Sequence, residues 1–493
     1  MSALSLPQRG DQLPFMRPCD SQRVKGWWFL PDAPEVRVPG VLTWTPDSGA
    51  ELELIGGLRG AAHEMAGTVD QTDLSVLETN LGTIYGETDA GKPVTLWDAE
   101  RHNFKADFGG AMREEFWHSS WVCIGSHLAS ADDRSLTGFR VAVDDLYYLT
   151  DDGRFCAPRW AKIEGVDHPG EQQPNGTLVA PYIIPVVGGV RADVATGSTS
   201  SATYSVCTDA TRPWFSEATE AMPDLKLELM TRRTRSGPSI TLGVDAWARI
   251  DPVLSPASAR DLLREIDPLL ALVSLATFAR SGVSWISAVK IDGDEVSLLC
   301  HFGHPGSPES LAGDGVFKFD DVSLESFLLT WDRLGDGPQA RYARNMTLGQ
   351  IGHSPAMVEE QIGQVLGAAE GFHRWCLGGG KDKMLKERLV DLHDRLPSHI
   401  QTRIGLRKEM EKWVGWAVWA RNNVDHGGAE KHRHIADFYH LKVIADSVRL
   451  VTYLAALQEF GVPDETIEEA LRNHPRVSVL AERCAKIASL PEL

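Results

Sequence analysis

The chain has 493 residues, of which 43% are hydrophobic and 24% are charged, and its formal net charge is −19. This length exceeds what one compact core supports, so two or three globular domains are expected. No apolar run is long enough for a signal peptide or a membrane span, and we therefore expect a cytoplasmic protein with no membrane partner.

The negative charge is concentrated in the first two thirds of the chain. Residues 341–493 contain 21 Lys and Arg against 20 Asp and Glu, a net charge of +1, which leaves 28 against 48, or −20, for residues 1–340. Because phosphate contacts depend on local positive charge, the acidic part is a poor nucleic-acid binder. Any RNA is expected to bind the C-terminal third, which also holds 9 of the 16 histidines.

The cysteines are odd in number, scattered and never spaced as C-x-x-C, which argues against a disulfide framework and a cysteine zinc site. We expect reduced and mostly buried thiols, no obligatory metal and no cofactor. The seven cysteines are Cys19, Cys123, Cys156, Cys207, Cys300, Cys376 and Cys484.

Residues 1–250 are predicted to form a β-rich domain. Long runs of strand character are broken by polar turns, without a helix-length apolar pattern between them, which indicates an antiparallel sandwich or barrel. The sequence Pro46-Asp47-Ser48-Gly49 has the residue types of a hairpin turn. The predicted strands are 41–45, 51–54, 83–85, 94–97, 116–124, 139–149, 182–187, 225–230 and 240–250.

Residues 251–340 are predicted to form an α+β bridge to the next domain. Ser255-Pro256 has the residue types of a helix N-terminus and opens an apolar segment up to Phe278, which can bend at Pro268. The Gly-Asp-Gly-Pro sequence makes 335–345 the best linker candidate. The other predicted elements are strands at 285–291 and 296–302 and a helix at 323–334.

Residues 341–493 are predicted to form an all-helical, up-and-down bundle. Its first helix begins at Ser354-Pro355 and carries an apolar seam, spaced by threes and fours, as far as Cys376. The glycines at 378–380 end this helix. The remaining predicted helices are 383–395, a third long helix up to about 426, 435–460 and two short terminal helices.

The third long helix carries the residues on which the functional interpretation depends. At about 100° per residue, Arg421 continues the apolar face, so a permanent charge is expected on a buried stripe. His426 is expected at the helix end, just before Gly427-Gly428. The apolar residues that recur every three or four positions on this face are Leu406, Met410, Trp413, Ala417 and Ala420.

The succession of Arg421, the polar Asn422 and His426 resembles the Rx4–6H motif of the HEPN superfamily of α-helical ribonucleases. Its place at the end of the third long helix of a bundle matches the helix order of a HEPN domain. Segments 26–32, 38–42 and 52–56 resemble the opening of the ApeA N-terminal domain. The chain therefore resembles ApeA-type anti-phage defence proteins, and the expected fold class is α+β multidomain, with a large antiparallel β-rich module before an all-α HEPN bundle.

The resemblance implies metal-independent RNA cleavage, with tRNA as one candidate substrate, under the control of an N-terminal domain that senses a phage signal such as a phage protein. Histidine can act as general base or acid, and the planar arginine fork suits phosphate oxygens. HEPN nucleases place two motifs face to face. Because each chain has one motif, a homodimer or higher homo-oligomer through the HEPN bundle is expected.

Other residues are expected to support Arg421 and His426. Asn422 is expected to hold one of them in place, and Glu370 on the first helix is a candidate counter-charge, since a buried arginine needs a partner. His373 lies on the apolar seam and is predicted to be a satisfied core histidine. The candidate RNA-binding rim consists of Lys431, His432, Arg433 and His434.

Each of these assignments has a plainer alternative. Arg421 can pair with an acid in the core while His426 only caps a helix, Glu370 can be a surface glutamate, and the rim can be a solvated face. Two other functions also stay open. One is a catalytically silent HEPN scaffold that binds RNA or a partner protein, and the other is a carbohydrate-binding β module with a dimerising helical domain, for which Trp27, Trp28 and Trp44 are either ligand contacts or core.

Overall fold

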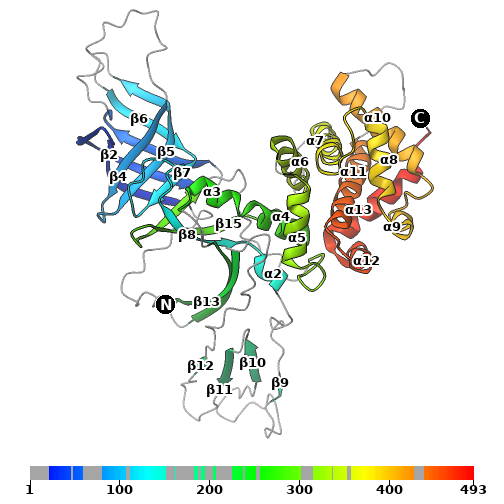
Figure 1. The fold of residues 1–493 in the computed structure, drawn as a ribbon, viewed down its shortest axis with the longest axis horizontal. Helices are drawn as coiled ribbons and strands as arrows, with labels where there is room; N and C mark the ends of the chain where they lie inside the picture. The colour runs from blue at the N-terminus through cyan, green and yellow to red at the C-terminus, as the bar shows by residue number, and fades with distance from the viewer. Residues whose placement is uncertain are drawn as a thin grey trace, which may run out of the picture.

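The first strands lie at one end of the molecule, further strands and several helices in the middle, and a helical bundle at the other end (Figure 1). This order confirms the predicted fold class. The computed structural model describes residues 21–45, 48–58, 80–106, 112–150, 161–162, 182–186, 190–194, 204–206, 225–236, 239–250, 256–300, 315–335, 337–351, 357–426 and 438–492.

The first strands close into an antiparallel barrel. They are β1 (Gln22–Leu30), β2 (Ala33–Thr45), β3 (Gly49–Ile55), β4 (Asn80–Thr88), β5 (Pro93–Ala106) and β6 (Met112–Ser119). The ring order is β1-β2-β3-β6-β5-β4, and the pairings β5 with β6 and β4 with β1 close it. The predicted hairpin is confirmed, because Thr45 pairs with Gly49 across the β2–β3 turn.

The inside of the barrel is filled by the alternate residues of each strand. Trp28 and Trp44 are fully buried there, so they belong to the core, whereas Trp27 points outward with 49% of its surface exposed. Gly86 provides the space for Trp28, since a Cβ atom at this glycine would lie 2.3 Å from the indole Cε3. The period-two alternation of large apolar and polar side chains therefore sets which face is inside.

Strand β5 continues into a wider sheet beyond the barrel. The sheet order is β13-β14-β8-β15-β16-β7-β5, with β7 (Trp121–Ile124), β8 (Leu136–Val143), β13 (Leu225–Ser236), β14 (Ser239–Ile250), β15 (Val283–Lys290) and β16 (Glu295–Cys300). A separate four-stranded sheet contains β9 (Ala161–Lys162), β10 (Tyr182–Val186), β11 (Val190–Val194) and β12 (Tyr204–Val206).

Two predicted strands were too long. The segment 116–124 is divided between β6 and β7, which both pair with β5 but have different second neighbours, β3 for β6 and β16 for β7. The segment 139–149 leaves the sheet after Val143, because Asp145 adopts a positive φ of 57° and turns the chain into the short helix α2 (Leu146–Thr150).

The predicted helix from 255 to 278 consists of two helices, α3 (Ala259–Arg264) and α4 (Asp267–Thr277). The break falls at the predicted proline, because Pro268 occupies the first turn of α4. The first helix starts later than predicted, since the Ser258 hydroxyl accepts a hydrogen bond from the Asp261 amide at 3.1 Å. The next helix, α5 (Leu324–Arg333), agrees with the prediction.

The predicted linker is wrong, because residues 338–349 form the helix α6 (Pro338–Gly349). Gly337 is the residue before the helix, and Pro338 is its first residue, a position at which proline needs no amide hydrogen. Ala340 and Ala343 are buried, so α6 packs into the interior. This helix runs across the predicted domain boundary at 340, and the domain limits stay predictions.

The C-terminal bundle has the predicted helix order, with one additional short helix, α9. Its helices are α7 (Val358–Gly371), α8 (Leu385–Asp394), α9 (Ser398–Arg403), α10 (Met410–His426), α11 (Phe438–Glu459), α12 (Asp464–Asn473) and α13 (Pro475–Ala485), with a π-helical turn η2 (Phe372–Cys376) and a 3-10 turn η3 (Lys486–Ser489). Helix α11 is buried along most of its length and packs against α7 and α13.

The bundle and the middle helices share one core, while the barrel has its own. One cluster of buried apolar side chains runs from the β8 region through α4 and α5 into the bundle, and a second cluster fills the barrel. At the junction, Tyr453 on α11 donates its hydroxyl to the carbonyl of Leu275 at 2.6 Å, and its ring lies 4.6 Å from that of Phe278. The bundle is therefore firmly attached to the middle of the molecule.

The described cysteines agree with the prediction of reduced, buried thiols. Cys123, Cys300, Cys376 and Cys484 are free and buried. Burial raises the pKa of Cys123 to about 12 and that of Cys376 to about 11, so both stay protonated at neutral pH. The other three, Cys19, Cys156 and Cys207, lie outside the described residues.

Candidate active site

Helix α10 carries Arg421 on the side of its buried residues, near its C-terminal end. Trp413, Ala417 and Ala420 are completely buried, and the Trp413 indole donates to the Ser447 hydroxyl at 2.9 Å. Arg421 itself keeps 38% of its side chain exposed, so the predicted burial is wrong. The helical period does not explain this difference, because Arg421 is only about 20° round the helix from Val414, which is completely buried. The exposure of Arg421 agrees instead with its position near the C-terminal end of α10.

The expected counter-charge of Arg421 is present. Glu370 lies near the end of α7, and its Oε2 atom is 3.0 Å from Arg421 Nη1. The carboxylate is itself 28% exposed. The ion pair thus crosses from α7 to α10 at the surface of the bundle, where it orients the guanidinium and leaves it accessible.

His426 is the last residue of α10. Five residues at a rise of 1.5 Å each put its backbone about 7.5 Å further along the helix axis than Arg421. The side chain of His426 and residues 427–437, which include the candidate rim of Lys431, His432, Arg433 and His434, lie outside the described residues. Asn422 is exposed, whereas the neighbouring Asn423 donates to the Trp419 carbonyl at 2.9 Å. The roles of Asn422, His426 and the rim stay predictions.

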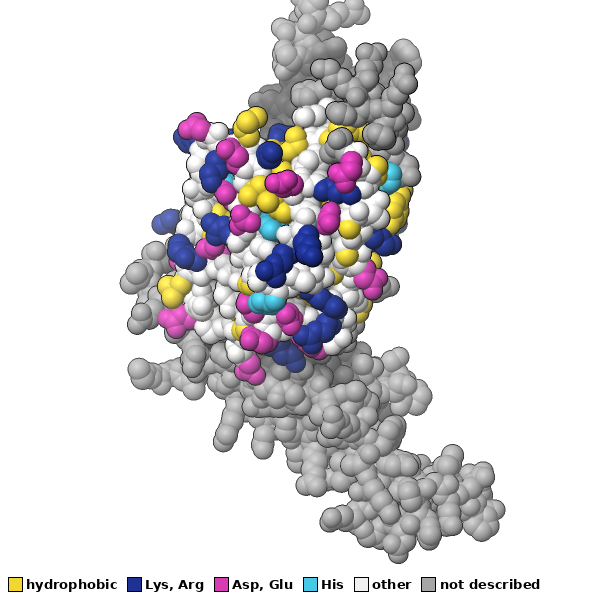
Figure 2. Space-filling view, turned by 90° about the vertical axis from the view of Figure 1, so that its right-hand side faces the viewer, with side chains coloured by type: hydrophobic (Ala, Val, Ile, Leu, Met, Phe, Trp, Pro, Cys, Tyr) yellow, Lys and Arg dark blue, Asp and Glu magenta, His cyan; other side chains and the backbone are white. Residues whose placement is uncertain are grey.

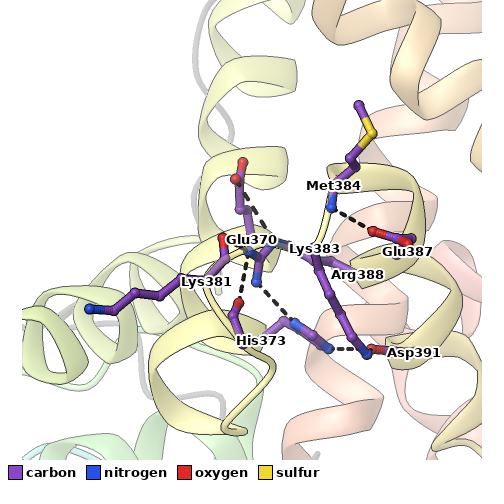
Figure 3. Close-up of polar contacts among 9 residues, drawn as sticks. Glu370, His373, Lys381, Lys383, Met384, Glu387, Arg388 and Asp391 are labelled. Atoms are coloured by element: carbon purple, nitrogen blue, oxygen red, sulfur yellow. Dashed lines mark hydrogen bonds and ion pairs between the residues drawn. The ribbon is translucent and has the colours of Figure 1, made fainter.

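A second arginine, Arg388 on α8, lies next to Glu370 (Figure 3). Only 1% of its side chain is exposed, and its Nε atom is 4.0 Å from Glu370 Oε1. It donates hydrogen bonds from Nη2 to the carbonyls of Gly380, at 3.0 Å, and Lys381, at 3.3 Å. The two oxygens of Glu370 therefore face two guanidinium groups, one buried and one at the surface.

His373 connects Arg388 to an acidic residue. Its Nε2 atom is 2.8 Å from Asp391 Oδ2, and its Nδ1 atom is 3.3 Å from Arg388 Nη1. Burial lowers the pKa of His373, despite the hydrogen bond to Asp391, which raises it. Because arginine can only donate, Nδ1 accepts and Nε2 carries the proton of a neutral ring. The prediction of a satisfied core histidine is confirmed.

Arg388 was not among the residues predicted for the site, although the sequence around it indicates a buried charge. Leu385, Leu389 and Leu392 form the buried stripe of α8, and Arg388 falls between them on the same face. A charge inside an apolar stripe is the pattern that drew attention to Arg421. In the structure, Arg388 is the arginine that is buried on such a stripe, whereas Arg421 is partly exposed.

Within the part of the chain that the structure describes, no group of three or more His, Cys, Asp or Glu side chains could hold a metal ion. The described helices include none that is long and apolar enough to cross a membrane.

Comparison with family models gives one match in the N-terminal part of the chain and one in the helical bundle. Residues 23–167 match ApeA N-terminal domain 1, and residues 342–466 match the Apea-like HEPN domain. The chain has an ApeA-type architecture. The matched HEPN segment contains Glu370, Arg388, Arg421 and His426, so the whole candidate site lies within it.

The two matched domains support the assignment of this ApeA-type chain as an anti-phage defence protein with a HEPN domain. Neither the curated proteins nor the solved structures contain a match to it.

Proposed function

We propose that this ApeA-type protein is an endoribonuclease of phage defence, which cuts RNA without a metal and uses Arg421 and His426 as catalytic residues. The main support is that Arg421 is held 3.0 Å from Glu370 while 38% of its side chain is exposed to solvent. A guanidinium in this situation is oriented and can still bind a phosphate. HEPN domains are typically ribonucleases, and the motif lies in the matched segment.

The reaction proposed is an attack of the RNA on itself. One imidazole removes the proton of a 2′-hydroxyl, whose oxygen forms a bond to the adjacent phosphorus. The bond from phosphorus to the 5′-oxygen breaks, and the leaving oxygen takes a proton from a second imidazole. The products are a 2′,3′-cyclic phosphate and a 5′-hydroxyl, while Arg421 stabilises the charge that develops on the phosphate oxygens.

The second imidazole in this scheme is His426 of another copy of the chain. A single motif supplies one base or one acid, so two bundles must bring their α10 ends together to complete the reaction. We therefore propose a homodimer through the HEPN bundle as the active form, in which each copy contributes one arginine and one histidine.

The distribution of charge supports binding of RNA by the bundle and not by the β module. Figure 2 shows Lys and Arg side chains interspersed with Asp and Glu on the outer face of the bundle, which agrees with the net charge of +1 for residues 341–493. Residues 1–340 carry −20 and repel a polyanion. We propose that this acidic module receives a phage-derived protein as the trigger.

The experiment that tests the proposal is expression of the wild type beside His426→Ala, followed by sequencing of RNA ends during phage infection. New ends with a 2′,3′-cyclic phosphate are expected only in the wild type. With purified protein, cleavage is expected to persist in EDTA. A 5′-phosphate product, or loss of cleavage on chelation, would show that the mechanism is wrong.

A further inference from the structure

The buried residues behind Arg421 form a chain of polar contacts that leads from the interior to the candidate site. We propose that Glu370 and Arg388 are positioning residues, which hold the Arg421 guanidinium in the orientation needed to bind phosphate. This inference rests on the proposed function, and it adds two residues, from α7 and α8, to a motif that lies entirely on α10.

Arg388 is the buried end of this series of polar contacts, and its position is fixed. The carbonyls of Gly380 and Lys381 and the imidazole of His373 hold both of its terminal nitrogens. Since the side chain is 1% exposed, water cannot replace these partners. The guanidinium is therefore held by contacts with the loop after η2 and with η2 itself, and it cannot follow the movements of the surface.

The histidine that holds Arg388 is fixed as well. Asp391, one turn further along α8, accepts from His373 Nε2 and is also bonded to Lys383. On the other side, the Gly379 amide donates to the His373 carbonyl at 3.0 Å. A Cβ atom at Gly379 would lie 1.9 Å from the imidazole Cε1, so only glycine permits this close approach. These contacts gather around η2, a π-helical turn of the kind that is frequent at functional sites.

Glu370 connects the fixed guanidinium of Arg388 to that of Arg421 and thereby restrains Arg421. An exposed ion pair alone restrains a long arginine side chain only weakly. Here the carboxylate has a buried cation on one side, with Arg388 Nε at 4.0 Å, and the surface cation on the other, with Arg421 Nη1 at 3.0 Å. Without Glu370 the negative charge between the two guanidinium groups would be lost, and the orientation of Arg421 would be less restrained.

The bundle contains a matched carboxylate that serves as a control. Glu459 at the end of α11 also contacts two arginines, Arg333 at 2.8 Å and Arg395 at 3.1 Å, and it is 18% exposed. Neither arginine belongs to the motif. Glu459→Gln therefore changes charge and stability in a comparable way without touching the candidate site.

The test measures kcat and KM for RNA cleavage by Glu370→Gln and Glu459→Gln in the full chain. Because small misplacements of catalytic groups cost on the order of 100-fold, Glu370→Gln is expected to lower kcat about 10- to 100-fold. Its KM and melting temperature should stay close to those of Glu459→Gln, which keeps the wild-type kcat. A folded Glu370→Gln variant with the wild-type kcat would overturn the proposal.

Two further measurements keep the test decisive. If Glu370 acts through Arg421, Glu370→Gln should have little additional effect in an Arg421→Lys background, whereas an independent role would multiply the two losses. The side-chain NMR signal of Arg421, assigned with Arg421→Lys, should become more mobile in Glu370→Gln and in Arg388→Met. Should the wild type not cut RNA, the proposed function fails while this signal still decides the positioning role, and an unchanged signal would refute it.

Discussion

The barrel and the bundle each contain a glutamate paired with arginine, but the two sites are built differently. In the barrel, Glu115 and Arg101 have side chains that are 4% and 8% exposed, with Oε1 and Nη1 3.3 Å apart. The second oxygen of Glu115 accepts from the Trp117 indole at 3.0 Å and from the Leu58 amide at 3.2 Å. Both charged side chains of this network are buried, and we call it a closed network.

In the bundle, the corresponding network is open at one end. Arg388, which is 1% exposed, is more deeply buried than Arg101, but Glu370 connects it to Arg421, which lies at the surface near the end of α10. In a closed pair the two charges neutralise each other within the fold, so the removal of one of them should lower the stability of the fold. An open network ends in a charge that a ligand can reach, so the removal of one of its members should weaken binding or slow catalysis. The following predictions separate these two cases.

The largest expected effect is on RNA cleavage, at the open end of the bundle network. Since acid–base catalysis contributes about 100- to 10,000-fold, His426→Ala should lower the cleavage rate by that order and remove phage protection. The residue ends α10, so the melting temperature and dimerisation should stay near the wild-type values. Arg421→Lys keeps the charge but should also lose most activity, because it lacks the planar fork.

A histidine of the same bundle provides the control for this prediction. His399 on α9 is a surface residue near Asp464 and Glu468, and His399→Ala should leave cleavage unchanged. Full protection from phage by a folded His426→Ala protein would show that the HEPN domain acts as a scaffold.

The next largest effect is expected on stability, in the barrel. Glu115→Ala removes the carboxylate that Arg101 contacts in the interior, and breaking a buried pair in this way lowers the free energy of unfolding by about 3–5 kcal/mol. RNA cleavage by the folded protein should be unaffected. Chemical denaturation measures the loss, and a fall of kcat like that in Glu370→Gln would abolish the distinction between the two networks.

The exposed neighbour of Glu115 is the control for stability. Glu114 pairs with Lys105 on the barrel surface, where ion pairs contribute about 0–1 kcal/mol. Glu114→Ala should therefore change the free energy of unfolding by no more than this amount.

A smaller effect is expected from dilution, because the proposed site needs two copies of the bundle. Light scattering should show at least a dimer at micromolar concentration, and the rate of cleavage per chain should fall as the dimer dissociates. A monomer under conditions in which RNA is cut would contradict the composite site.

The smallest expected effect is a dependence of stability on pH. Burial lowers the pKa of His373 from its ordinary value of 6.5, so between the lowered value and 6.5 the unfolded chain binds a proton that the folded chain does not. The contribution of His373 is therefore complete above pH 6.5 and is lost as the pH falls. Melting temperatures should decrease in this range more in the wild type than in His373→Gln, whose amide does not titrate. Parallel curves would contradict the lowered pKa.

The extent to which the site could be predicted follows from how local each feature is. Helix α10, its buried residues and the position of His426 at its end depend on periodicity within one segment, and the sequence predicted them. The sequence also suggested Glu370 as the partner of Arg421, 51 residues away, from the need of a charge for a counter-charge. Arg388 was missed, because its place behind Glu370 depends on how α8 packs against α7.

The sequence alone thus determined the order of the β-rich and helical parts, the positions of most helices and strands and the motif at the end of α10. These features follow from the period of apolar residues and from helix-end and turn residues within short segments. The tertiary structure decided the closure of the barrel through β5 and β6, the incorporation of α6 into the interior and the half-exposure of Arg421. Each of these depends on which surfaces of distant segments meet and at what angle. No local pattern contains that information, because packing between elements is selected by the fit of whole faces.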